Sequence, residues 1–470
     1  MDENGRIAKT IAAVAVAVAM AGSALLAWYH IRTTSIWYDE TITLLTVAGH
    51  ALPNWSLGFG RFEGSANFTR ILTDLYRYDV HPPLYFWTVA IWRVWAGHSI
   101  ESIRLLSAVF IVASIWLLYR VASMFPMRWP AVPALIYAIS GAAIGYAYTA
   151  RSYAMANFLI VLTIYWAQRK CAWTGVIAAS CIAVHYFSAL CIVPILLVHC
   201  CERWKTDRRW SVLTASSFAV LCALLLPLAL VHLRARPDQY AATASFLGDL
   251  KAMLSGSFST GFASSSAGLV RKATQFTVAA LLLAGAIFSV RRRVTVVSLT
   301  LVAFVAGFFF LSVLTHKPVA NMPTSYYFGF IAPVLALLIG FGVDAIPQLT
   351  PVLAGLLIVS TATSRPIVPA SVNYRAVVEA IRPRCSGCSI VVGAGFGRGV
   401  PGSVLYEAAG IPILVLNRSN FVRIIDQAGK LSSVFFIPSK EAVSAPLERE
   451  FIEILKLRPV SGYFAVAPER

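Results

Sequence analysis

The sequence predicts a polytopic α-helical membrane protein with a small C-terminal α/β domain. Hydrophobic residues make up 58% of its 470 residues and charged residues only 13%, whereas charged residues form about a quarter of an average soluble domain. Apolar stretches of bilayer-spanning length recur through most of the chain, and charges are spread more evenly over the last part. We therefore expect about 10–13 transmembrane helices followed by a domain outside the membrane.

Each apolar stretch is expected to form a helix, because only helices and closed barrels satisfy every backbone hydrogen bond within lipid. The stretches lie at about 10–29, 105–124, 130–148, 152–167, 172–201, 211–233, 273–290, 294–315, 325–346 and 350–363. Residues 172–201 are long enough to hold two helices. The first stretch is expected to be retained rather than cleaved as a signal peptide, since no convincing small-residue cleavage site follows it.

The formal charge of +18 could indicate nucleic-acid binding, but the cations do not gather into one basic region. They are concentrated in short segments between apolar stretches, including "CERWKTDRRW" (201–210) and "RRR" (291–293). Under the positive-inside rule such segments are cytoplasmic anchors. We expect the lipid bilayer and no nucleic acid among the partners, with part of the positive charge available for an anionic lipid substrate.

These anchors predict which other segments lie outside the cytoplasm. Counting back from them places Arg151, "HYF" (185–187) and the C-terminal tail outside. Counting forward from the first helix conflicts with this, because the short apolar segment 83–97 would place Arg104 inside. One segment between residues 83 and 168 is therefore expected to be half-spanning or re-entrant, unless a helix is miscounted.

Two regions outside the predicted helices define the domain organisation. Residues 30–82 form a long, aromatic-rich outer loop, and loops of this length are commonly functional. Residues 364–470 contain the strand-like runs "SIVVGAG", "IPILVLN" and "SSVFFIP", separated by helix-like stretches such as "YRAVVEAIR", which predicts an α/β arrangement. The prediction is a transmembrane domain over 1–363 and an extracytoplasmic domain over 364–470.

Two motifs in the tail could bind a metal or a cofactor. "CSGC" (385–388) has C-x-x-C spacing, but no second pair or nearby histidine completes a zinc site. A disulfide or two free thiols is expected instead. "GAGFGRG" (393–399) follows a predicted strand, but Arg398 occupies the position of the third glycine in a dinucleotide-binding motif. We expect an ordinary glycine-rich loop there.

Both ends of the outer loop bring an acid to the bilayer surface. Asp39 and Glu40 lie in "SIWYDETITL", and Asp79 and His81 lie in "YDVHPPLYFW", where a proline pair allows a new helix to start. Asp39 could merely cap a helix that begins at Thr41, and the histidine could merely bind the turn. Their convergence on one membrane face favours a functional site.

Cations at the ends of apolar stretches complete this pattern; they are Arg104, Arg151, His185 and Lys317. An ionisable group near hydrocarbon is costly, so unless it snorkels it faces a partner or a water-filled cavity. Such acids and cations suit group transfer from a lipid phosphate. A carboxylate near Asp39 would take a proton from an acceptor hydroxyl as the hydroxyl attacks an anomeric carbon. Cations or a metal would stabilise the departing phosphate.

Four motifs, in order along the chain, carry a family resemblance: "WYDETITLLTVAG", "DVHPPLYFWTVAIWRVWAGHSIESIRLLSAVF", "YAYTARSYAM" and "VHYFSAL". Together they resemble the bacterial branch of the protein-mannosyltransferase-like GT-C glycosyltransferases, which comprises glycosyltransferase family 39 and its ArnT-like relatives. The resemblance runs from about residue 10 to residue 345, and "NYRAVVEAIRP" (373–383) resembles the start of the tail in many members.

The resemblance implies a GT-C fold and an inner-membrane enzyme. Such an enzyme moves a sugar from a polyprenyl-phosphate carrier to an envelope lipid, glycan or protein on the outer face and inverts the anomeric configuration. The family's catalytic base corresponds to Asp39, with Glu40 beside it. The expected donor-phosphate and substrate-binding residues, from the resemblance and the boundary cations together, are Asp79, His81, Arg104, Arg151, Tyr153, His185, Tyr186, Lys317 and Tyr326.

One position departs from the family pattern. Many relatives carry an arginine followed by a tyrosine before the late helix, whereas this chain has Ser325 and Tyr326. If that arginine contacts the lipid phosphate, Lys317 is the expected substitute. Some members use a divalent cation and others do not, so the resemblance leaves a metal cofactor open.

Two other classes of function compete with this interpretation. A lipid or glycan transporter (a flippase) would place its essential charges near mid-membrane and often shows paired, interrupted helices, whereas the acids here lie in a loop and we find no internal repeat. A catalytically idle scaffold would tolerate substitution of Asp39, His81 and Arg151. No motif identifies the sugar or the acceptor.

Overall fold

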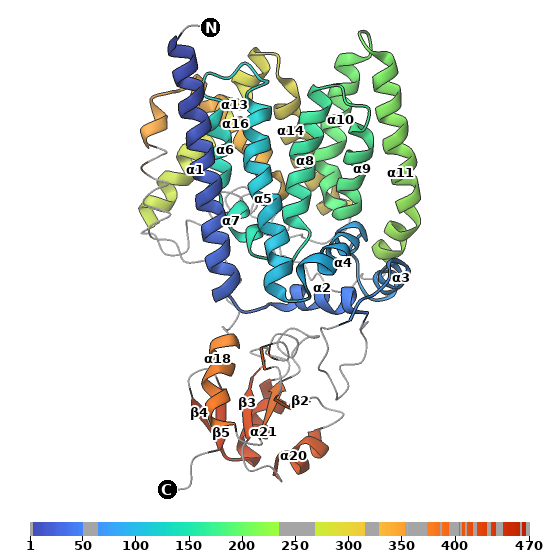
Figure 1. The fold of residues 1–470 in the computed structure, drawn as a ribbon, viewed down its shortest axis with the longest axis vertical. Coiled ribbons are helices and arrows are strands. Elements are labelled where there is room, and N and C mark those ends of the chain that lie inside the picture. Colours follow the sequence, from blue (N-terminus) through green and yellow to red (C-terminus); the bar gives the residue numbers. More distant parts are fainter. Residues whose placement is uncertain are drawn as a thin grey trace. The chain divides into compact units, whose positions relative to one another are not determined.

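The protein is a polytopic α-helical membrane protein with a small C-terminal α/β region, as the composition predicts (Figure 1). The computed structural model describes residues 3–49, 64–234, 268–314, 329–352, 355, 374–385, 388–393, 404, 407–408, 411–416, 421–429, 434–438, 445–460 and 463–466. The chain divides into two compact units. Unit 1 comprises Met1–Ile31, Asp79–Thr88 and Ile103–Ile367, and unit 2 comprises Arg32–Tyr78, Val89–Ser102 and Val368–Arg470.

Unit 1 is built from apolar helices. The helices that lie wholly or mostly in it are α1 (Glu3–Thr33), α5 (Ile100–Ala122), α6 (Ala131–Ala138), α7 (Gly141–Ala147), α8 (Tyr153–Gln168), α9 (Thr174–Val184), η1 (Tyr186–Ser188), α10 (Ala189–Arg203), α11 (Arg208–Arg234), α13 (Gly268–Arg291), α14 (Thr295–Leu314), η3 (Gly329–Ile331) and α16 (Ala332–Ala345). Most of the predicted stretches thus form helices close to the expected boundaries.

Several of these helices can cross a bilayer. Among the described residues, four segments are long and apolar enough, namely Arg6–Thr33, Ile100–Ala122, Tyr186–Arg203 and Arg208–His232. Large apolar side chains on them face outward; Leu25 is 70% exposed and Leu224 is 73% exposed. Exposed aliphatic surface of this kind suits contact with lipid rather than water, so the protein is a multi-pass membrane protein.

Small residues allow α13 and α16 to pack closely. A Cβ atom added to Gly285 on α13 would collide with the carbonyl of Leu338 on α16, and one added to Gly342 on α16 would collide with the carbonyl of Leu281 on α13. The two glycines therefore set the distance between the helix backbones. Close backbone approach through small residues is a common way to join helices in lipid, where no hydrophobic driving force acts between them.

One predicted span is wrong as a continuous helix. Residues 130–148 form α6 and α7, which are separated at Ser140. The Ser140 hydroxyl donates to the carbonyl of Tyr137 (2.7 Å) and accepts from the backbone N–H of Ala143 (3.2 Å). Serine thus supplies an N-cap that starts a new helix. Residues 172–201 form two helices as predicted, with the break at His185. The predicted stretch 350–363 lies almost entirely outside the described residues.

Unit 2 combines the outer loop with the C-terminal region. Its helices are α2 (Tyr38–Ala48), α3 (Phe68–Tyr78), the C-terminal part of α4 (Leu84–Ala96), α18 (Tyr374–Ile381), η4 (Arg382–Arg384), α20 (Phe421–Gly429) and α21 (Ala445–Ile454). Its strands are β1 (Ser389–Gly393), β2 (Ile413–Leu416), β3 (Val434–Ile437), β4 (Leu457–Val460) and β5 (Tyr463–Val466). The predicted boundary at 363/364 lies outside the described residues and remains a prediction.

The five strands form one mixed sheet in the order β2-β1-β3-β5-β4. β1 pairs in parallel with β2 and β3, whereas β5 runs antiparallel to β3 and β4. Alternate residues of β1 face opposite sides of the sheet: Ile390 packs in the cluster that contains α18, and Val391 in the cluster that contains residues of α20 and α21. Helices therefore cover both faces, which explains why β1 is buried along its whole length.

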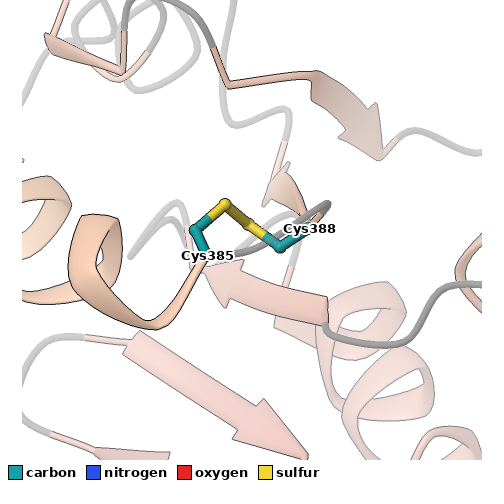
Figure 2. Close-up of a disulfide and its surroundings, with 2 residues drawn as sticks. All are labelled: Cys385 and Cys388. Atoms are coloured by element: carbon teal, nitrogen blue, oxygen red, sulfur yellow. A yellow bond between two sulfur atoms is a disulfide. The ribbon is translucent and has the colours of Figure 1, made fainter.

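The tail confirms several predictions. The three predicted strand runs correspond to β1, β2 and β3, and Figure 2 shows that Cys385 and Cys388 form a disulfide. Strands β4 and β5 were not predicted. β4 is an edge strand that contains Pro459 and is mostly exposed, so neither hydrophobicity nor β-propensity marks it. The loop 394–399 of the glycine-rich motif lies outside the described residues.

Candidate functional site

The predicted base lies in the first turn of a buried helix in unit 2. Asp39 is only 7% exposed and Glu40 is fully buried. The positive end of the helix macrodipole stabilises negative charge at this position. The helix that could have begun at Thr41 begins at Tyr38 instead, so Asp39 lies within the first turn and is not the N-cap.

Glu40 has a structural contact in this turn. Its Oε2 accepts a hydrogen bond from the backbone N–H of Trp37 at 3.2 Å. Trp37 is the N-cap of α2, and a glutamate that reaches back to the N-cap amide forms half of a capping box. The contact stabilises the start of the helix and leaves Asp39 as the carboxylate of the pair that is the better candidate for chemistry.

Unit 1 contains a buried chain of three polar side chains. The Nδ1 atom of His81 lies 2.8 Å from Oδ1 of Asp79, and the Nε2 atom of His81 lies 2.7 Å from Nη2 of Arg151. Asp79 and Arg151 are almost inaccessible to solvent. All three residues were predicted individually from the sequence, and the structure brings them together although Arg151 follows His81 by 70 residues.

The hydrogen-bond partners of His81 assign a donor and an acceptor role to its two ring nitrogens. A guanidinium group can only donate hydrogen bonds, so Nε2 of His81 must accept the bond from Arg151. The proton of a neutral imidazole then resides on Nδ1 and is donated to Asp79. His81 therefore connects a carboxylate to a guanidinium, and its two partners fix the orientation of the imidazole ring.

Local sequence explains how Asp79 holds this position. Its Oδ1 also accepts the backbone N–H of Val80 at 2.7 Å. The proline pair that follows His81 leads directly into α4. N–H groups at the start of a helix have no partner within that helix, so prolines, which lack the N–H, are tolerated there. Burial alone would raise the pKa of Asp79, but its interactions with His81, Arg151 and the Val80 amide hold that pKa below its ordinary value. Asp79 is therefore ionised at neutral pH.

Aromatic rings pack around His185, which was predicted as a substrate-binding residue. Tyr153 stacks on Tyr146 with ring centroids 5.0 Å apart and contacts His185 at 5.3 Å. Phe330 of η3 contacts the same histidine at 5.6 Å. Tyr146 and Phe330 were not predicted. The run "YAYTARSY" held a signal for Tyr146, because it places three tyrosines around Arg151.

Two buried polar atoms near these groups remain available for a ligand. Within the part of the chain that the structure describes, Oδ2 of Asp79 and Nδ1 of His185 are inaccessible and make no hydrogen bond. A buried polar atom without a partner costs free energy, so a bound hydroxyl or amide would be favourable at either atom. A carboxylate oxygen accepts a hydrogen bond from a sugar hydroxyl, and a neutral imidazole nitrogen can donate or accept one.

The other predicted residues have separate surroundings or are not described. Arg104 is buried, and its Nη1 donates to the carbonyl of Ile31 on α1 at 3.3 Å, a contact that connects α5 to α1. The Tyr186 hydroxyl lies 3.2 Å from Nδ1 of His232 on α11, a residue that was not predicted. Lys317 and Tyr326 lie outside the described residues.

A metal site is not evident among the described side chains. No three histidine, cysteine, aspartate or glutamate residues in the described ranges lie close enough together to hold an ion. Asp79 and His81 lie two residues apart and could supply one oxygen and one nitrogen ligand, but Arg151 occupies the Nε2 atom of the histidine.

Comparisons with known proteins give similarities to solved structures only. No family model and no curated protein matches the sequence. One similar structure is arabinofuranosyltransferase AftD from Mycobacteria, with 16% identity and a TM-score of 0.49 over 90% of this chain and 35% of AftD. ArnT from Cupriavidus metallidurans in the apo state has 10% identity and a TM-score of 0.43 over 97% of this chain and 98% of ArnT. The Archaeoglobus fulgidus oligosaccharyltransferase has 13% identity and a TM-score of 0.41 over 93% of this chain and 60% of that protein.

The chain therefore spans about a third of AftD but nearly the full length of ArnT. ArnT has also been solved with undecaprenyl phosphate bound, and that structure aligns with 11% identity and a TM-score of 0.43 over 96% of this chain and 98% of ArnT.

Proposed function

We propose that this chain is an integral-membrane glycosyltransferase. It transfers a sugar from a polyprenyl-phosphate carrier to an envelope acceptor, which can be a lipid, a glycan or a protein. The proposal rests on the buried, hydrogen-bonded side chains of Asp79, His81 and Arg151. A guanidinium with its orientation fixed by a second group is well suited to a phosphate oxygen, and a buried cation in a membrane protein marks a functional site by default.

The proposed reaction is a single displacement at the anomeric carbon. Asp39 takes the proton of the acceptor hydroxyl as the hydroxyl oxygen attacks that carbon. The bond between the anomeric carbon and the phosphate oxygen breaks, and polyprenyl phosphate leaves with the electron pair. One displacement inverts the anomeric configuration. Cationic groups stabilise the negative charge that develops on the phosphate, which is the function we propose for Arg151.

The remaining predicted residues are proposed to bind the substrates. The available atoms of Asp79 and His185 suit sugar hydroxyls, and the ring of Tyr153 suits the apolar face of a sugar. Arg104, Tyr186, Lys317 and Tyr326 remain candidates for donor binding. A divalent cation, if one is used, would add charge stabilisation at the phosphate.

The chemistry is proposed to occur on the extracytoplasmic face of the bacterial inner membrane. The Cys385–Cys388 disulfide supports this orientation for the C-terminal region, because disulfides persist outside the reducing cytosol. The positively charged connections that follow α10 and α13 support the opposite, cytoplasmic side for those helix ends.

The test is sugar transfer by the purified full-length protein in detergent. Wild type, Asp39→Asn and the control Glu453→Gln are incubated with radiolabelled polyprenyl-phosphate sugars and crude envelope acceptors, with and without a chelator. Glu453 is an exposed carboxylate of α21. We expect transfer by wild type and by the control, and none by Asp39→Asn, because asparagine keeps the shape but cannot act as a base. The chelator arm determines whether a metal is needed.

A different result would contradict the proposal. If no donor turns over with any acceptor while the wild type in vesicles moves a labelled lipid across the bilayer, and Asp39→Asn still moves it, the protein is a transporter. Equal transfer by wild type and Asp39→Asn would remove Asp39 as the base. Circular dichroism and size-exclusion profiles of Asp39→Asn must match those of wild type.

A further inference from the structure

Unit 2 contains a contact between the C-terminal region and the chain that leads into α2. Glu407 accepts two hydrogen bonds at Oε1, one from the Ser35 hydroxyl (3.3 Å) and one from the backbone N–H of Ile36 (3.2 Å). These residues are separated by more than 370 positions in the sequence. The outer loop and residues 368–470 belong to one compact unit, which agrees with a direct connection between them.

Arg375 makes the second part of this contact. Its Nε donates to Oε2 of Glu407 at 3.0 Å, and its Nη2 donates to Oε1 of Glu101 at 3.2 Å. Its backbone N–H donates to the Ser35 hydroxyl at 3.2 Å, and its Nη1 donates to the carbonyl of Arg32. We name Arg375 and Glu407 together the loop clamp. Four of its hydrogen bonds reach residues 32–36 directly.

The clamp is sheltered from solvent. The side chain of Glu407 is 7% exposed and that of Arg375 is 21% exposed. Burial alone would lower the pKa of Arg375, but the carboxylates of Glu407 and Glu101 raise it above its ordinary value, so the guanidinium is charged at any physiological pH. Charged hydrogen bonds shielded from water are stronger and more directional than surface ion pairs, so the clamp restrains the segment at a defined position.

The restrained segment lies immediately before the proposed base. Ile36, whose amide Glu407 binds, precedes Asp39 by three residues, and Trp37 between them is the N-cap that Glu40 binds. Each residue from Ser35 to Trp37 is therefore held by a hydrogen bond to Glu407 or Glu40. A shift of the clamp would be transmitted to the carboxylate of Asp39 with little loss.

We propose that Arg375 and Glu407 are positioning residues for Asp39, so that the C-terminal region orients the base. This inference rests on the proposed function of Asp39. Neither clamp residue acts on the substrate. They define the start of α2, because misplacing a catalytic group by about 1 Å can reduce a rate by about a hundredfold.

The first experiment measures the restraint without activity. Amide hydrogen exchange of peptides that cover residues 33–45 is compared between wild type, Glu407→Gln and the control Glu450→Gln in the full-length protein. Glu450 is an exposed glutamate in the same region of the chain. Glu407→Gln should speed exchange in this segment at least about tenfold, which corresponds to about 1.4 kcal/mol, and the control should not. If Glu407→Gln does not fold, Ser35→Ala removes two of the clamp's bonds with a smaller change.

The second experiment measures transfer kinetics with the same variants. We expect kcat of Glu407→Gln and Arg375→Met to fall about ten- to hundredfold, with KM for the donor within about twofold of wild type, since donor binding does not depend on the base. Arg375→Lys retains the charge but not the fork of donors, so its kcat should lie between those of wild type and Arg375→Met.

Three results distinguish the possibilities. If kcat of Glu407→Gln equals that of Glu450→Gln, the positioning inference is overturned. A lower kcat with unchanged exchange in residues 33–45 overturns it as well, because the effect would not pass through the segment. If wild type transfers no sugar, the proposed function falls and the positioning of a base falls with it, whereas faster exchange in Glu407→Gln would still establish the clamp as a structural contact.

Discussion

Replacing His81 by phenylalanine is the sharpest test of the buried polar chain. Phenylalanine keeps a flat ring of similar size beside Phe86, whose ring centroid lies 6.4 Å from that of His81, but it removes both ring nitrogens. Asp79 and Arg151 then each lose a hydrogen bond. Neither can turn to water, because Asp79 is 8% exposed and Arg151 is 2% exposed.

The magnitude follows from these two contacts. A hydrogen bond that involves a charged group contributes about 1.5–3 kcal/mol, and His81 makes two, at 2.8 Å and 2.7 Å. His81→Phe should therefore destabilise the protein by about 3–6 kcal/mol. At about 2 °C or more per kcal/mol for a domain of 150–250 residues, the Tm should fall by at least about 6 °C.

The assay is thermal unfolding of the purified protein in one detergent at pH 7, at a fixed scan rate. His98→Phe is the matched control, since His98 is an exposed histidine in the connection between α4 and α5. If His81→Phe unfolds within about 1 °C of the control, the reasoning from buried charged hydrogen bonds is refuted. A second variant, Asp79→Asn, retains one carbonyl oxygen that can accept from His81 and should fall between wild type and His81→Phe, because the charge and one acceptor oxygen are lost.

Three further predictions concern other contacts. The pKa of Asp79 is lowered on folding, so the stability that its ionised form contributes is complete above the ordinary aspartate pKa and is lost as pH falls. Asp79→Asn should therefore show a flatter Tm profile than wild type between pH 5 and pH 3. The stability of wild type should change with pH by up to about 1.4 kcal/mol per pH unit more than that of the variant. Glu40→Ala should destabilise α2 by about 1 kcal/mol through loss of its N-terminal cap, detected as faster amide exchange at the start of that helix, with Glu453→Gln unchanged. Gly285→Leu should prevent the close approach of α13 to α16 and lower the Tm by several degrees, whereas Gly22→Leu on exposed α1, where an added Cβ meets nothing, should not.

Helices and strands that are uniformly apolar were predictable from the sequence. Bilayer-length runs such as Ile100–Ala122 need no tertiary information, because hydrophobicity alone separates lipid-facing helices from loops. The disulfide was one of two predicted outcomes at its C-x-x-C spacing. The break at Ser140 was not predicted, since serine is common within apolar helices. Only the observed hydrogen bonds distinguish an N-cap serine from a serine inside a continuous helix.

Contacts between distant segments were predictable only as separate candidates. Asp79, His81 and Arg151 were each predicted, but their hydrogen bonds depend on the packing of elements 70 residues apart. The contact of Arg375 with Glu407 was missed because both residues lie in a tail whose local pattern describes only strands and helices. Local periodicity reports which face of an element is buried and contains no information about which charged side chains meet.

The irregular backbone around Arg151 explains how this residue reaches the hydrogen-bonded side chains of His81 and Asp79. Non-helical backbone among apolar helices is tolerated only where protein groups or a cavity satisfy it. Between α7 and α8 that requirement is met: the carbonyl of Thr149 accepts from the Ser107 hydroxyl at 2.7 Å and from the Arg151 amide at 2.9 Å. A continuous helix over this segment would be more stable by itself but would move Arg151 away from His81. Ser107→Ala should therefore weaken the turn and, if Arg151 binds the lipid phosphate, raise KM for the donor more than it lowers kcat. An unchanged KM would separate the turn from donor binding.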